Sequence, residues 1–177
     1  MPAAYPTADP QALINGESIG SVLAALPTPG AAQALLQAHG PPAAPQPGRW
    51  YSVQAWLDVL AALEAAHGPE APYSAGLQVI NHSLWPPDLH TLHDALRALD
   101  GAYRANVPGE DMGYYRTEGV GLREIRVLCR TPNPADFAWG IVTGLARKFR
   151  PLNAARVDVH KEAPAAPAGY TSFRVSW

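Results

Sequence analysis

Apolar residues recur at helical spacing through the first two thirds of the chain. The clearest case follows Ser52, a suitable N-cap, and ends at the helix-stopping pair Gly68-Pro69. Its apolar stripe consists of Val53, Trp56, Leu57, Leu60 and Leu63. Because this stripe covers one side of the helix only, we expect the helix to pack on the core.

Four further helices are predicted around this one. Ser18 is the expected N-cap of a helix that ends near Pro27, and a short second helix covers about residues 31–39. Another covers about residues 73–84 and ends before Trp85. Asp88 is the expected cap of the last, whose apolar face is formed by Leu89, Leu92, Leu96, Leu99 and Tyr103.

After Gly109 the pattern alternates as in strands. Strands are predicted at residues 113–118, 122–130, 155–161 and 170–177, with a helix over 134–149 between the second and third. The pattern therefore predicts an α+β domain in which N-terminal helices pack on one face of a roughly four-stranded antiparallel sheet. We expect residues 1–17 to be a flexible arm and residues 18–177 to be one ligand-binding-type domain.

Composition narrows the class of function. The formal net charge of −2 and the pI of about 6.3 give little attraction to phosphate backbones or anionic lipid, so no nucleic-acid or membrane partner is expected. Cys129 is the single cysteine, which excludes an intramolecular disulfide and favours a cytoplasmic location. No leader-like segment or spanning apolar run is found. Eleven arginines against two lysines are typical of a GC-rich, bacterial genome.

Several segments, in order along the chain, resemble a known superfamily. They read INGESIGSVLAAL, LLQAHG, RWYSVQAWLDVLAALEAAHG, LRALDGAYRANVPGEDMGYY, IRVLCRTPNPADFAWGIVTGL and GYTSFRVSW. The chain resembles the haem-NO-binding and 4-vinyl-reductase-type ligand-binding domains, which include gas sensors and aromatic-sensing input modules. The resemblance implies a non-enzymatic small-molecule sensor, or signal-input domain, with a largely apolar pocket between helices and sheet.

The chain departs from the superfamily's metal ligands. The resemblance places Asp100 where the haem branch has its proximal histidine, and Cys129-Arg130-Thr131-Pro132-Asn133 where that branch has a Tyr-x-Ser-x-Arg motif. The stretch HKEAPAAPAGY lacks the cysteines that hold zinc in other relatives. We therefore expect no cofactor, with both haem and zinc disfavoured. The expected partners are a small apolar or aromatic molecule, a signalling protein and a second copy in a homodimer.

The candidate ligand-binding residues are aromatic, aliphatic and histidine side chains expected near the interface between helices and sheet. They are Trp56, Leu60, His82, Trp85, His93, Tyr103, Phe137, Trp139 and Ile141. Ordinary core packing would use the same apolar residues. Two alternatives stay open: a structural or assembly module whose pocket is filled by side chains, and a tetrapyrrole- or metal-binding protein that uses its histidines.

Other motifs have simpler explanations. Residues 16–20 match the G-x-S-x-G nucleophile elbow, but without a predicted strand before Ser18 the serine is better explained as a helix cap. His90 and His93, one turn apart on the expected helix, form a metal site only if a third ligand reaches them. Arg116, Arg126 and Arg130 are expected on a solvated face of the sheet. Gly140 and Gly144 indicate close packing of their helix, usually on a sheet.

Overall fold

The computed structural model describes residues 4–25, 29–42, 44–162 and 169–177. The helices are α1 (Gly16–Ala25), α2 (Pro29–Ala38), α3 (Val53–His67), α4 (Glu70–His82), α5 (Leu92–Asn106) and α6 (Ala135–Lys148). The strands are β1 (Leu13–Asn15), β2 (Trp50–Ser52), β3 (Tyr114–Gly121), β4 (Glu124–Arg130), β5 (Asp158–Lys161) and β6 (Thr171–Ser176). The predicted α+β class is confirmed, and α6 does lie between the second and third strands of the four-stranded sheet.

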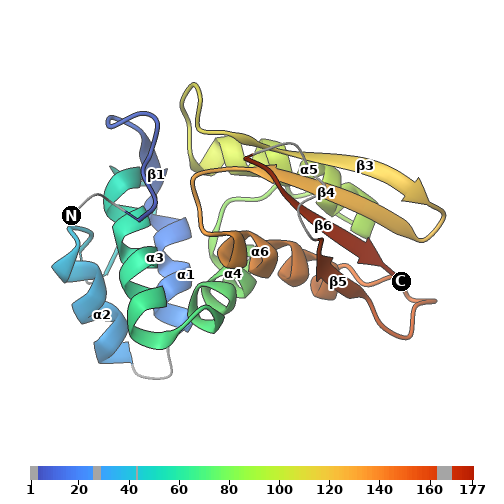
Figure 1. Cartoon of the computed structure of the whole chain (residues 1–177), viewed down its shortest axis with the longest axis horizontal. Helices are drawn as coiled ribbons and strands as arrows, with labels where there is room; N and C mark the ends of the chain where they lie inside the picture. The colour runs from blue at the N-terminus through green and yellow to red at the C-terminus, as the bar shows by residue number, and fades with distance from the viewer. Residues whose placement is uncertain (1–3, 26–28, 43, 163–168) are drawn as a thin grey trace.

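The four-stranded sheet has the order β3-β4-β6-β5 with all neighbours antiparallel. Its inner face buries Ile125, Val127, Phe173 and Val175, which alternate with charged residues that face outward. Figure 1 shows α5 and α6 against this sheet, while α1 to α4 form a second group that joins it at α6. The core is therefore continuous through both groups.

The N-terminal region differs from the prediction. Residues 13–15 pair with residues 50–52 as a two-stranded antiparallel sheet, and Ala12, Ile14 and Asn15 are buried. Since α1 begins at Gly16, residues 12–17 belong to the folded chain rather than to an arm. A three-residue strand offers too few positions for an alternating pattern to stand out in the sequence.

Two predicted helix caps are wrong by a few residues. The side chain of Asn15, not Ser18, accepts a hydrogen bond at the start of α1, from the backbone N–H of Ser18. Thr91, not Asp88, caps α5 and forms a reciprocal capping box with Asp94. The box satisfies two backbone donors at once, which favours Thr91 over the earlier carboxylate. Ser52 caps α3 as predicted.

Helices α4 and α6 meet at their backbones. A Cβ added to Gly76 would lie 2.2 Å from the carbonyl oxygen of Phe137, and one added to Gly140 would lie 2.1 Å from that of Tyr73. Gly144 similarly faces the carbonyl oxygen of Leu77. The two glycines in α6 thus pack on a helix, not on the sheet as expected. We call the Gly76–Gly140 contact the glycine seam.

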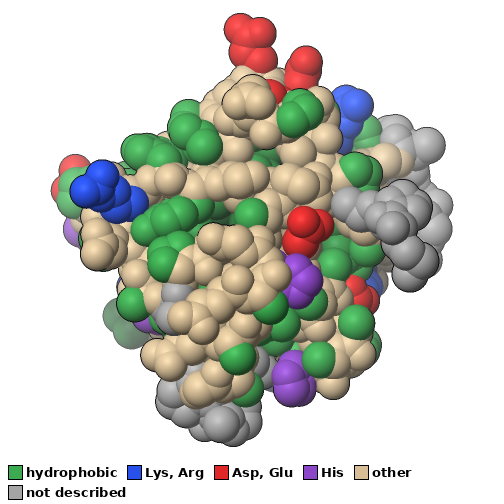
Figure 2. Space-filling model, turned by 90° about the vertical axis from the view of Figure 1, so that its left-hand side faces the viewer, with side chains coloured by type: hydrophobic (Ala, Val, Ile, Leu, Met, Phe, Trp, Pro, Cys, Tyr) green, Lys and Arg blue, Asp and Glu red, His purple; other side chains and the backbone are tan. Residues whose placement is uncertain are grey.

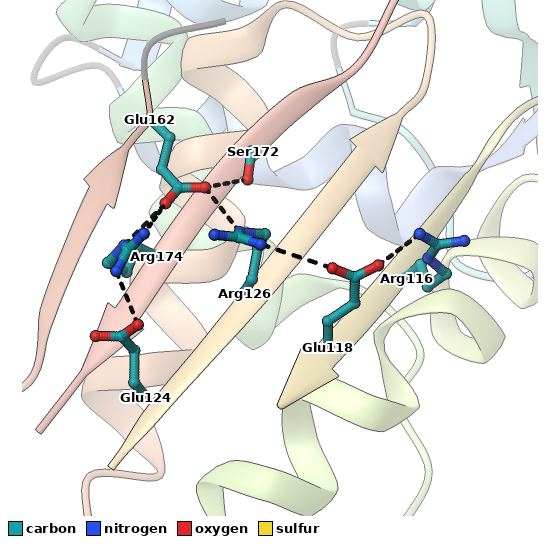
Figure 3. A network of polar contacts seen from close by, with 7 residues as sticks. All are labelled: Arg116, Glu118, Glu124, Arg126, Glu162, Ser172 and Arg174. Atoms are coloured by element: carbon teal, nitrogen blue, oxygen red, sulfur yellow. Dashed lines mark hydrogen bonds and ion pairs between the residues drawn. The ribbon is translucent and has the colours of Figure 1, made fainter. Parts of the chain in front are cut away.

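Charged side chains form a continuous network on the outer face of the sheet (Figure 3). Glu162 accepts hydrogen bonds from Ser172, from Arg126 at 3.0 Å and from Arg174 at 2.8 Å. These hydrogen bonds, that of Ser172 foremost, lower the pKa of Glu162 to about 2. Arg116 pairs with Glu118, and Arg130 lies 5.8 Å from the centre of the Tyr170 ring. The expectation of a solvated face is confirmed, with ion pairs at Arg116 and Arg126 but, within the described part of the chain, not at Arg130.

Candidate functional site

A cavity of about 40 Å³ lies between the helices and the sheet. Its wall draws on β1, α1, α3, α4, α5, β3 and α6, so most of the fold contributes to it. The wall is mainly apolar. Ile14, Val79, Leu99, Val107 and Ile141 are among its aliphatic residues. A site in which so many elements converge can respond to their relative positions.

Aromatic side chains fill most of the space around the cavity. Trp56 and Phe137 meet edge to face with their ring centres 5.4 Å apart. The indole N–H of Trp56 donates to the side-chain oxygen of Asn133 at 3.2 Å, which fixes the ring relative to the start of α6. The indole N–H of Trp85 donates to the carbonyl oxygen of Val79 at 3.4 Å. These bonds hold each indole in one orientation.

Asn106, in the last turn of α5, organises the polar side of the cavity. Its side-chain oxygen accepts hydrogen bonds from Asn15 at 2.6 Å, from Ser18 at 3.1 Å and from the backbone N–H of Leu84 at 3.0 Å. Its amide nitrogen donates to the carbonyl oxygens of Leu84 and Ala102. Ser18 also bonds to Ser83 at 2.8 Å. One buried amide thus ties together the start of α1, the α4–α5 connection and α5.

Tyr115 lines the cavity and has an unpartnered hydroxyl. The residue is 4% exposed, and its hydroxyl has no hydrogen-bond partner within the described residues, although Cys129 and Thr131 lie nearby. The neighbouring Tyr103, with its ring centre 5.5 Å away, donates its hydroxyl to the carbonyl oxygen of Met112. Burial raises the pKa of Tyr115 well above its ordinary value, so the hydroxyl is protonated.

Cys129 lies beside these tyrosines. It is buried, and burial raises the pKa of its thiol. The thiol is therefore a small core group with little thiolate character, as expected from its apolar strand face.

The structure brings together five of the nine candidate residues. Trp56, Trp85, Tyr103, Phe137 and Ile141 line the cavity. The other four lie elsewhere. Leu60 is buried in the core on α3, His82 is exposed at the end of α4, His93 is exposed on α5 against the ring of Trp177, and Trp139 is half-buried and donates its indole N–H to Val159.

Sequence reasoning missed the polar residues of the cavity: Ser83, Asn106, Tyr115 and Asn133. A signal existed for Asn106, which continues the apolar stripe of Leu92, Leu96, Leu99 and Tyr103 at helical spacing. A polar side chain on an apolar stripe is buried and needs partners. The alternation of β3 indicates that Tyr115 points inward, because its neighbour Arg116 points outward. The sequence cannot indicate that its hydroxyl lacks a hydrogen-bond partner among the described residues, because that depends on the residues brought near it by the fold.

Two motifs are corrected by the structure. A strand, β1, does precede Ser18, but the serine lies within the first turn of α1 and bonds to Ser83 and Asn106 rather than to a histidine. His90 precedes α5, which begins at Leu92, so the two histidines are not one turn apart on a helix. Among the described residues no group of three or more His, Cys, Asp or Glu side chains could hold a metal ion.

No family model matches the sequence, and no curated protein matches it. Solved structures do match. One, from work on haem distortion in the H-NOX family, has a TM-score of 0.70 and 16% identity over 93% of this chain and 95% of its own. An oxygen-binding H-NOX domain related to soluble guanylate cyclases, in its oxygen complex, has a TM-score of 0.66 and 16% identity over 91% of each chain. A mutant H-NOX of T. Tengcongensis has a TM-score of 0.64 and 14% identity over 90% and 92%.

The matching structures overturn the expectation of no cofactor, because the first is described by haem distortion and a further one, with a TM-score of 0.68 and 15% identity, by haem redox potential and porphyrin distortion. Haem is therefore a cofactor to be considered for this fold. The side chains as placed do not fit it: the cavity holds about 40 Å³, whereas ligand pockets of that class measure several hundred Å³. Asp100, at the position matched to the proximal histidine, accepts hydrogen bonds from the backbone N–H of Tyr115 and from Arg104. A group as large as haem would therefore require side chains that line the cavity to move.

Within the described part of the chain, no helix has the length and apolar character needed to cross a membrane. The whole architecture, from β1 to β6, corresponds to that of the solved H-NOX domains over about nine tenths of the chain. The protein therefore has an H-NOX-like fold, with an aromatic-lined cavity between its helices and its sheet.

Proposed function

We propose that this chain is a non-enzymatic ligand-binding domain that provides the input to a signalling partner. The observation that carries the proposal is that Tyr115, a residue lining an apolar cavity, has a buried hydroxyl without a partner among the described residues. A buried polar group without a partner costs about 1–3 kcal/mol, and a ligand that bonds to it recovers part of this energy.

The cavity sets the size of the ligand. A cavity must offer about 10–15 Å³ to hold one water molecule. The cavity of about 40 Å³ therefore admits a molecule of a few atoms without rearrangement. Its chemistry would be an apolar body with one group that hydrogen-bonds to Tyr115. A larger aromatic ligand, or haem, needs side chains that line the cavity to move.

The ligand would act by shifting the population of helix packings. Because the cavity is lined by α1, α3, α4, α5, α6 and β3, an occupant contacts both helical groups and the sheet together. It stabilises the packing that it fits best, and a partner protein or a second copy of the chain reads that packing. Catalysis is not part of this proposal, since Ser18 is bonded to Ser83 and Asn106.

The small size of the cavity favours a second candidate function, a structural or assembly module. In that case the aromatic side chains are the filling of the core, and the fold serves to present surfaces. The two functions differ in one measurable property, which is whether a ligand stabilises the folded chain.

The experiment compares native and denaturing mass spectra of the purified full chain, followed by thermal unfolding with three added probes: ethanol as a molecule of a few atoms, benzaldehyde as a small aromatic molecule, and haem. We expect a bound mass lost on denaturation, or a raised Tm with at least one probe. Tyr115→Phe should weaken benzaldehyde binding about fivefold, the worth of one hydrogen bond. Tyr73→Phe, outside the cavity, is the matched control.

Each outcome selects one function. A stoichiometric haem complex with an intense visible absorption would assign haem as the sensor's ligand. Bare protein in the spectra together with an unchanged Tm for all three probes would contradict the sensor proposal, and a stable oligomer in the same spectra would then support the assembly module.

A further inference from the structure

A second hollow lies at the far end of the sheet from β1. It is a surface groove of about 750 Å³ between the start of α5, the β3–β4 turn, the end of α6 and Trp177. Figure 1 shows the β3–β4 turn and the end of β6 at this same end of the molecule. We call it the terminal groove. It shares no lining residue with the cavity, so it is independent of the proposed function.

Basic side chains line the terminal groove. Arg123, Lys148 and Arg150 line it together with His90 and His93, and no Asp or Glu is among its lining residues. None of these five side chains makes an ion pair within the described residues, and Arg150 bonds only to the carbonyl oxygen of Ala155. This is notable in a chain whose formal net charge is −2.

Six of the ten Arg and Lys side chains outside the groove form ion pairs in the described structure. The paired ones are Arg104, Arg116, Arg126, Arg156, Lys161 and Arg174. Figure 2 shows the opposite end of the molecule, which carries α2 and α3, where charged side chains lie scattered singly. The terminal groove thus brings three cations that are unpaired in the described structure, Arg123, Lys148 and Arg150, to one concave surface.

Apolar side chains complete the groove. Leu122 in the β3–β4 turn is 99% exposed, and Leu152 after α6 is fully exposed. Phe149 and Trp177 are half-buried beside them. Large aliphatic side chains at full exposure gain from being covered, and charges without partners gain from opposite charges.

We propose that the terminal groove binds an acidic segment of a partner protein in which carboxylates flank apolar side chains. The carboxylates pair with Arg123, Lys148 and Arg150, and the apolar side chains cover Leu122 and Leu152. A groove suits an extended or helical segment better than a flat lipid surface, and the net negative charge of the chain disfavours an anionic membrane.

The test uses the full chain and a fluorescein-labelled peptide of alternating glutamate and leucine, followed by fluorescence anisotropy. We expect saturable binding that weakens with added salt. The double variant R123E/R150E should weaken binding about tenfold or more, and R49E/R97E should change it less than twofold. Arg49 and Arg97 are also exposed and unpaired in the described structure but lie outside the groove, which makes this the matched control.

A second variant separates the apolar contribution. L122S/L152S alters two exposed side chains, so the fold should tolerate it, and it should also weaken peptide binding. The proposal is overturned if R49E/R97E weakens binding as much as R123E/R150E, or if the peptide does not bind. It is also overturned if the chain binds vesicles of phosphatidylglycerol in an Arg123- and Arg150-dependent manner without binding the peptide.

Discussion

Single polar side chains determine how the parts of this protein are joined, and Asn106 is the main example. Its amide uses all of its hydrogen-bonding capacity on groups from the start of α1, from the α4–α5 connection and from α5 itself. Each partner is buried or partly buried. Loss of the amide would therefore leave several groups without a partner at the same time.

Asn106→Ala should lower the free energy of unfolding by about 3 kcal/mol, because Asn15, Ser18 and the N–H of Leu84 would lose a common acceptor. Urea denaturation measures the change. Asn81→Ala is the control, since Asn81 is exposed and should cost less than about 0.5 kcal/mol. Equal costs for the two variants would contradict this role of Asn106.

At the scale of single residues, the sequence predicts whether a side chain is buried better than it predicts which groups the side chain contacts. The apolar stripe after Ser52 and the burial of Cys129 follow from periodicity and are confirmed. Thr91 was missed as a cap because Asp88 and Thr91 are both good capping residues. The choice between them depends on the Asp94 side chain, which completes the capping box only for Thr91.

Elements are held in register by two different kinds of contact. Helices α4 and α6 meet backbone to backbone at the glycine seam, which leaves no space for a side chain at Gly76 or Gly140. The strands are crossed on their outer face by the network around Glu162. The first contact depends on shape and the second on charge, so different perturbations test them.

Gly140→Ala should destabilise the protein by about 2–3 kcal/mol, because the added Cβ would overlap the carbonyl oxygen of Tyr73. Gly101→Ala in α5 is the matched control. An added Cβ there meets nothing within 4 Å, so alanine should stabilise the helix by about 0.5–1 kcal/mol. Thermal unfolding of both variants checks the opposite signs, and a destabilised Gly101→Ala would contradict the argument.

The Glu162 network makes stability depend on pH. In the folded protein the pKa of Glu162 is about 2, below its ordinary value of 4.5. Ionised Glu162 therefore stabilises the fold at pH values above 4.5, and this stabilisation is lost as the pH falls toward about 2. Glu162→Gln should cost about 1 kcal/mol at neutral pH, after allowance for screening by solvent, and should flatten the acid-side loss. Urea denaturation across that range tests this, with the exposed Glu110→Gln as control.

The positions of helices and strands are predictable where the apolar pattern repeats several times. The helix after Ser52, the helix before Pro151 and the strands around Ile125 and Phe173 were found because each repeats its period several times. The β1–β2 pair was missed because three residues cannot show a period. The partner of Gly140 was also missed, since spacing within one helix does not identify the element that it faces.

At the scale of the whole molecule, the helical group α1–α4 and the sheet group meet at the cavity, at Asn106 and at the glycine seam. Sequence resemblance predicted this architecture, and the solved H-NOX structures confirm it. The ligand was not predictable from the same resemblance, because function depends on particular side chains and not on the fold alone.

We expect the two groups to unfold as one cooperative unit, because their junction contains both the backbone packing of the glycine seam and the buried hydrogen bonds of Asn106. Tryptophan fluorescence follows all five tryptophans, among them Trp56 in the helical group and Trp139 beside the sheet, while far-ultraviolet circular dichroism follows the helices. Urea transitions from the two signals should share one midpoint. Separate midpoints would show that the junction is weaker than its contacts indicate.

The glycine seam also has a consequence for protein engineering. It lies next to the cavity, since Phe137 contributes its carbonyl oxygen to the seam and its ring to the cavity wall. The α4–α6 contact is made by main-chain atoms, so no side chain there can be shortened. The side chains of Trp56 and Phe137, in contrast, can be replaced by smaller residues. Substitutions intended to enlarge the cavity should therefore be made at its aromatic side chains, while Gly76 and Gly140 of the α4–α6 pair are left unchanged.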